Sequence, residues 1–143
     1  MAPWETTKIG DLQVTATPSR HGPAWAVPIV GPTTGFALGA AEVVWISGDT
    51  VVFPGVLEVA DRLTVDTAIL HLGKVQFGLT GPARFTMTGR DAVRLCSHVK
   101  PRRIVPVHYE GWSHFHEGRA EIAAAFPPDA LTWLVPGVAT ELP

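Results

Sequence analysis

The second half of this chain alternates between apolar segments of strand length and amphipathic segments of helical length. An apolar segment at 67–72 precedes a helix predicted over 88–99, and a strand predicted at 103–108 precedes a helix predicted over 117–126. A further short strand is predicted at 131–134. This alternation indicates an α/β layer, because successive strands build one sheet and the intervening helices cover at least one face of it.

The helix over 88–99 carries the clearest signals. Thr88 is a good N-cap residue, and Asp91 three positions later gives an acidic variant of the capping box. Apolar residues then recur at helical spacing at Ala92, Leu95, Cys96 and Val99. Because Cys96 lies on this stripe, we assign it to core packing rather than catalysis. As the chain's single cysteine, it forms no intrachain disulfide.

The first half predicts strands separated by a long loop. Residues 12–17 alternate as a half-buried strand does, and residues 35–38 and 42–46 are predicted to form a hairpin. The stretch 18–32 holds four prolines and two glycines, so we predict no regular structure there. A short amphipathic helix is predicted around 57–63.

Composition limits the class of protein. The 143 residues are 46% hydrophobic and 17% charged, which suits one folded domain over 1–143. Eleven basic and 13 acidic residues give a net charge of −2 without a basic block, so nucleic acid is not indicated as a partner. We find no signal peptide and no apolar run near the roughly 20 residues that cross a membrane. We expect a soluble, cytoplasmic protein that acts on a small molecule.

Three polar residues follow predicted strands. His21, Asp49 and His108 each lie just past the C-terminal end of a strand. Ligand sites in open α/β sheets gather at that edge, and imidazole and carboxylate are ligands that zinc and similar metals prefer. Spacing alone leaves two interpretations open: a metal site, or structural histidines beside a turn at 47–50.

Three motifs add to this pattern. Residues 15–23 (TATPSRHGP), 44–50 (VWISGDT) and 105–115 (VPVHYEGWSHF) resemble, in the same order, segments of bacterial metallo-β-lactamase-fold hydrolases related to ascorbate-6-phosphate lactonases. The resemblance extends from about Trp4 to Leu134. It implies the C-terminal half of a metallo-β-lactamase αββα sandwich, an α/β fold in which a mixed sheet carries helices on one face.

The resemblance also implies roles for single residues. His21 would complete the three-histidine ligand set of a first metal, Asp49 would bridge two metals, and His108 would bind the second. Asp49 and His114 are the candidate catalytic residues. His114 and Glu110 would lie on the substrate side, with solvated loop positions as the alternative for both. Zinc is the expected cofactor, and manganese or iron suits the same ligands.

One family motif is absent. The family requires His-x-His-x-Asp-His, which supplies two ligands to each metal, whereas the only His-x-His here, at 114–116, lacks the Asp-His pair and follows the other motifs. We assign His71 and His98 structural roles. Only 20 residues precede His21. We therefore expect the N-terminal half of the domain, with four of the seven ligands, to be missing.

The implied activity is hydrolysis of an ester, lactone, amide or phosphoester by metal-activated water, with this chain inactive alone. Two alternatives stay open: a non-catalytic fragment or degenerate homologue that acts as an interaction module, and one half of a two-chain enzyme. A nuclease is disfavoured because no basic groove is evident. The strands at 43–46 and 67–72 are apolar on both faces. They therefore predict self-association or a complementary N-terminal half.

Overall fold

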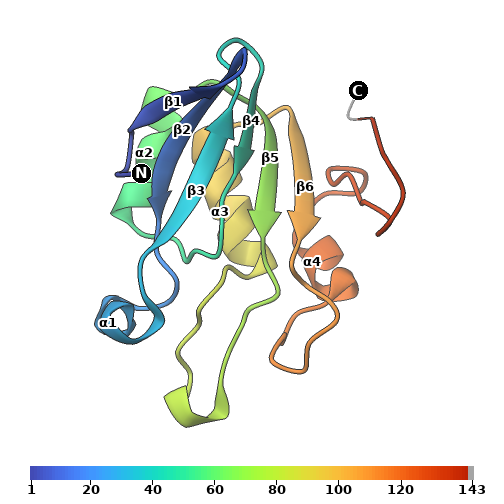
Figure 1. The fold of residues 1–143 in the computed structure, drawn as a ribbon. Helices are drawn as coiled ribbons and strands as arrows, with labels where there is room; N and C mark the ends of the chain where they lie inside the picture. Colours follow the sequence, from blue (N-terminus) through green and yellow to red (C-terminus); the bar gives the residue numbers. More distant parts are fainter. Residues whose placement is uncertain (142–143) are drawn as a thin grey trace.

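The fold, described by a computed structural model for residues 1–141, centres on one six-stranded sheet. The strands, in their order across the sheet, are β1 (Thr6–Ile9), β2 (Leu12–Ser19), β3 (Thr33–Leu38), β4 (Val43–Ile46), β5 (Val65–His71) and β6 (Arg103–Val107). Strands β1 to β4 pair antiparallel, and β4, β5 and β6 pair parallel (Figure 1). The predicted mixed α/β sheet is confirmed.

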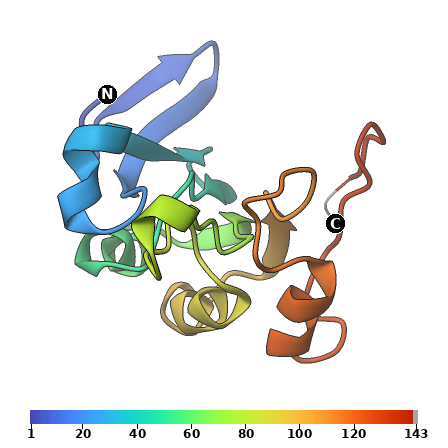
Figure 2. The same cartoon turned by 90° about the horizontal axis from the view of Figure 1, so that it is seen from below.

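Helices cover one face of this sheet. The longer ones are α2 (Pro54–Arg62), α3 (Gly89–Val99) and α4 (Arg119–Ala125). Shorter turns are the 3₁₀ segments η1 (Ala24–Ala26) and η2 (Gly78–Thr80), and α1 (Val27–Val30). The view from below shows α2 and α3 side by side on the same side of the sheet (Figure 2). Within residues 1–141, no helix has the length and apolarity needed to cross a membrane.

The core lies between the sheet and these helices. Trp45 is fully buried there, and its indole Nε1 donates a hydrogen bond to Thr17 Oγ1 at 3.1 Å. This bond satisfies the one polar group of the largest core side chain. Cys96 packs against the same core, and burial raises the pKa of its thiol to about 12. Its assignment to packing is consistent with this environment.

The opposite face of the sheet is apolar and only partly covered. Phe36 pairs with Ile46, and Ile46 pairs with Ile69, so these three side chains form one row on this face. Phe36 is 37% exposed, and Ile46 and Ile69 are half-buried. Their neighbours along the strands, such as Trp45, point to the helices and are fully buried. We call this surface the open face.

Two sequence predictions are wrong, and one strand was not predicted. The stretch 18–32 is not irregular throughout: β2 continues through Pro18, and α1 forms with Pro28 in its first turn, where a missing N–H costs little. The strand predicted at 131–134 does not form, and one backbone hydrogen bond to Ile104 takes its place. Strand β1 is exposed along its whole length and therefore lacks the alternation that reveals a strand.

The predicted start of α3 is confirmed. Thr88 Oγ1 accepts a hydrogen bond from the Asp91 backbone N–H at 3.0 Å, and Asp91 Oδ2 accepts one from the Thr88 N–H at 3.1 Å. Two backbone donors at the helix start are thereby satisfied. The helix ends at Lys100, which adopts a left-handed conformation before Pro101.

Replacing Thr88 tests this cap. We expect Thr88→Ala to lower the free energy of unfolding by about 1 kcal/mol, because one N-terminal donor of α3 loses its acceptor. Thr88→Ser is the matched control, since it keeps the hydroxyl. Urea denaturation followed by circular dichroism measures both variants. Equal stability of the alanine and serine variants would contradict the assignment.

Candidate metal centre

Asp49 lies in a tight turn directly after β4. The Ser47 hydroxyl accepts a hydrogen bond from the His71 backbone N–H at 3.0 Å, which ties this turn to the end of β5. Gly48 has a φ of 63°, and a Cβ there would lie 2.7 Å from the Thr34 carbonyl oxygen. Only glycine fits that conformation and space. The turn is thus fixed through its neighbours, and the Asp49 carboxylate stays free for other contacts.

The segment that carries His21 is bonded to the same turn. The Arg20 N–H donates to Thr50 Oγ1 at 3.0 Å, and the Val51 N–H donates back to the Arg20 carbonyl at 3.0 Å. His21 follows immediately, so its backbone lies beside the Asp49 turn although the two are 28 positions apart in sequence.

The ring of Phe85 packs beside His21. The two ring centroids are 5.4 Å apart. Gly22 makes room for this aromatic ring, because a Cβ at that position would lie 2.6 Å from Phe85 Cδ1. The glycine of the first motif therefore has a packing function next to the histidine.

His108 follows β6 with a backbone φ of 59°. Residues other than glycine seldom adopt this left-handed conformation, and it occurs often at functional sites. His108 Nε2 lies 3.7 Å from Asp49 Oδ2, and the two side chains are 28% and 33% exposed. Gly73 passes against the His108 carbonyl so closely that any Cβ would collide with it. Asp49 and His108, two of the three residues expected to converge, therefore lie side by side.

His71 is a member of this cluster that sequence reasoning assigned to structure alone. It is the last residue of β5, and its ring centroid lies 5.6 Å from that of His108. Burial lowers the pKa of the His71 imidazole; Asp49 raises it and His108 lowers it further. The alternation along β5 could have revealed it, since His71 shares the open face with Ile69.

Three buried imidazole nitrogens lack a hydrogen-bond partner within the described chain: Nδ1 of His21, His71 and His108. Buried polar atoms are nearly always paired, so each of these nitrogens is available for a hydrogen bond or a metal ion. Imidazole nitrogen and carboxylate oxygen match zinc and similar metals. Among residues 1–141, however, no three potential ligands already converge closely enough to hold a metal. The donor types fit a metal.

The candidate catalytic residue His114 lies farther along the loop that follows β6. Its ring packs against Phe115 at 4.9 Å, and Phe115 in turn packs against His108 at 4.7 Å. Phe115 thus stands between the two histidines in this chain of contacts, and the catalytic role of His114 remains a prediction. Glu110 is exposed, which favours its alternative as a solvated loop residue.

The sequence is similar to that of known metal-dependent hydrolases. Residues 1–109 match a family model described as the beta-lactamase superfamily domain. A UPF0173 metal-dependent hydrolase of Pyrobaculum calidifontis is 32% identical over 106 residues, covering 73% of this chain and 41% of that protein. One from Pelotomaculum thermopropionicum is 27% identical over 121 residues, covering 80% and 49%. The chain spans less than half of the length of these relatives.

Solved structures show the same fold. An isothiocyanate hydrolase from Delia radicum gut bacteria superposes with a TM-score of 0.82 at 20% identity, over 96% of this chain and 57% of that one. A "possible metal-dependent hydrolase" from Veillonella parvula gives 0.77 at 22% identity, over 85% and 49%. At these identities the likeness concerns the fold alone. It confirms the predicted metallo-β-lactamase type of sheet with helices on one face.

Zinc titration tests the cluster. We expect the isolated chain to bind at most one zinc ion weakly, because too few ligands converge to close a coordination sphere. Asp49→Asn should weaken this binding by about tenfold or more, because it removes the negative charge that favours a cation, and loss of a group that only orients a ligand already costs about tenfold. Asp61→Asn, an exposed site on α2, is the control of equal charge change. Calorimetry that finds two tightly bound zinc ions per chain would contradict the incomplete site.

Proposed function

This chain belongs to the beta-lactamase superfamily, and from that premise we propose that it forms part of a metal-dependent hydrolytic centre. The bond attacked would be an ester, lactone, amide or phosphoester of a small molecule. One observation carries the proposal: His108 Nε2 lies 3.7 Å from Asp49 Oδ2 at the carboxyl end of the parallel strands. The metal-dependent hydrolases among the sequence relatives support it.

In this proposal His21, Asp49 and His108 hold metal, with His71 as a further imidazole at the same edge. Zinc is the first choice, and manganese or iron suits the same ligands. A bound metal of this kind lowers the pKa of water toward neutrality and so supplies hydroxide for hydrolysis. The Asp49 carboxylate offsets cationic charge and favours the orientation of His108.

Aromatic residues of the chain keep two of these imidazoles in place. Phe85 packs on the ring of His21, and Phe115 packs on the ring of His108 at 4.7 Å. Each aromatic ring excludes water from one side of its histidine and restricts the rotation of the imidazole. Such restriction is what a metal ligand needs, because a loosely held ligand costs binding energy.

We further propose that the remaining metal ligands come from a segment outside these 143 residues. The His-x-His-x-Asp-His motif of the resembling family does not occur in the sequence. The chain also covers only 41% and 49% of the two relatives described above. The complementary segment would belong to a longer form of this protein or to a separate chain, and the present chain would be inactive without it.

Activity assays test both parts of the proposal. We expect the chain alone, with zinc added, to stay near background on a phosphodiester, a lactone and a chromogenic β-lactam. Co-expression with the N-terminal half of the Pyrobaculum calidifontis relative should restore hydrolysis of at least one of them. His108→Ala and a chelator should each abolish that activity, whereas His98→Ala, an exposed histidine on α3, should not.

Two results would count against it. Robust, chelator-sensitive turnover by the chain alone that His108→Ala abolishes would show that no further segment is needed. Activity of the complemented protein that survives both His108→Ala and the chelator would contradict the metal-dependent mechanism itself.

The open face supports a second candidate function, that of an interaction module. A row of apolar side chains on this face is only partly covered, including Phe36 at 37% exposure. Each Å² of apolar surface left in water forgoes about 25 cal/mol, so covering this row would stabilise the chain. Exposed apolar patches often mark interaction sites. We propose that a second copy of the chain covers it when no complementary half is present.

Analytical ultracentrifugation tests this candidate. We expect the wild-type chain to associate at micromolar concentration and Phe36→Lys to shift it to monomer, because the lysine charge cannot be buried in an apolar interface. Leu79→Lys is the matched control, since Leu79 lies fully exposed in the η2 turn, away from the open face. A wild-type chain that stays a compact monomer at high concentration would contradict the prediction.

A further inference from the structure

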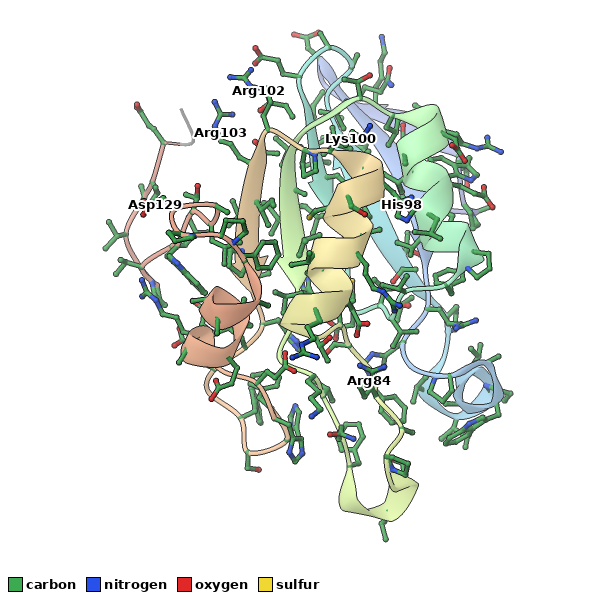
Figure 3. All side chains as sticks on the ribbon, turned by 180° about the vertical axis from the view of Figure 1, so that it is seen from behind. Arg84, His98, Lys100, Arg102, Arg103 and Asp129 are labelled. Carbon is green, nitrogen blue, oxygen red and sulfur yellow. The ribbon has the colours of Figure 1, made fainter. Side chains whose placement is uncertain are left out.

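A cleft, which we call the arginine cleft, lies on the helix side of the molecule. It is open, with a volume of about 650 Å³, and is lined by residues that follow β2 and β4, by the η2 loop and by the first turns of α3. Figure 3 views this side and labels Arg84 in the region between the start of α3 and α1. The volume is in the range of small-molecule sites. The open face is on the other side of the sheet.

Positively charged residues form part of the lining of this cleft. Arg20, Arg84 and Arg94 line it together with one acid, Asp91, so three positive and one negative charge leave a formal balance of +2. Asp91 Oδ2 already accepts from Arg84 Nη1 at 3.0 Å and from the helix cap. Within residues 1–141, neither Arg20 nor Arg94 forms an ion pair. The cleft therefore holds cationic charge that the described chain does not neutralise.

The guanidinium of Arg20 is held in position before any ligand binds. Its Nε donates to the Gly22 carbonyl at 3.1 Å, and the group lies 4.6 Å from the ring centroid of Phe53. Its terminal N–H groups donate no hydrogen bond within residues 1–141. A planar guanidinium fixed in this way binds phosphate or carboxylate oxygens in pairs, at a low entropic cost.

Apart from Thr80, the rest of the cleft is apolar. This wall consists of Pro23, Trp25, Val51, Val52, Pro82 and Ala83. Trp25 is 58% exposed, although burial of its large ring would be favourable. Exposed tryptophan and arginine in one cleft are characteristic of binding surfaces, where the indole supplies flat contact area. A ligand that fills both parts of the cleft has an anionic head and a flat apolar body.

We propose that this cleft binds a small phosphate monoester with a flat apolar body. The dianionic phosphate would lie among the three arginines, whose local charge balance it matches, and the body would lie against Trp25. The site uses none of the candidate metal ligands, so it goes beyond the proposed function and does not depend on it. It adjoins that centre, because Arg20 precedes His21 and Arg84 precedes Phe85, which packs on His21.

Calorimetry on the metal-free chain tests the proposal with phenyl phosphate as the probe, and with inorganic phosphate and phenol as partial ligands. We expect phenyl phosphate to bind about tenfold more tightly than either, because only it occupies both parts of the cleft. Arg94→Gln should weaken its binding about tenfold, the loss typical of one charge-assisted hydrogen bond. Trp25→Ala should remove the preference for phenyl phosphate over inorganic phosphate.

Arg90→Gln is the matched control. Arg90 lies on the same helix and is exposed, but it does not line this cleft, so the variant should bind as the wild type does. Equal losses in the two arginine variants would show diffuse attraction and overturn the site. So would phenol binding as tightly as phenyl phosphate, no detectable binding at 10 mM ligand, or tighter binding of a single-stranded oligonucleotide, which would indicate a nucleic-acid surface instead.

Discussion

The parallel register of β4, β5 and β6 is the constraint on which the candidate metal centre depends. Ile46 pairs with Ile69, and His71 pairs with Val107, so the carboxyl ends of the three strands lie within two residues of one another at one edge. Whatever follows each strand must then meet there. The hydrogen bond from His71 N–H to the Ser47 hydroxyl at 3.0 Å ties the first two ends together. Asp49 and His108 approach each other as a consequence of strand pairing.

Sequence reasoning predicted the elements whose signals are local. The Thr88 cap and the apolar stripe of α3 specify that helix without help from the rest of the fold. Strand β1 was not predicted, because a fully exposed edge strand needs no apolar alternation. Its hydrogen bonds to β2 hold it in the sheet. The strand predicted at 131–134 was wrong for the opposite reason: an apolar segment forms a strand only where it can pair with a neighbouring strand.

The site shows the same division. Motifs and strand ends indicated Asp49 and His108, and the structure brings them together. His71 was missed because an apolar strand around a histidine suggests a structural residue, whereas its position on the face with Ile69 depends on the side from which the helices cover the sheet. Phe115 packs between His114 and His108. This position depends on side-chain packing, which the spacing of motifs does not predict.

The two candidate sites differ in how far the chain itself encloses them. Asp49 and His108 remain 33% and 28% exposed, and they lie at the edge that the open face shares. Charges in water attract weakly, so the proposed hydrolytic chemistry would gain from cover that excludes solvent. Cover would also stabilise the apolar row beside them. One partner surface on the open face would satisfy both needs at once. The arginine cleft, on the helix side, is lined by residues of this chain. Its ligand binding can therefore be measured on this chain alone.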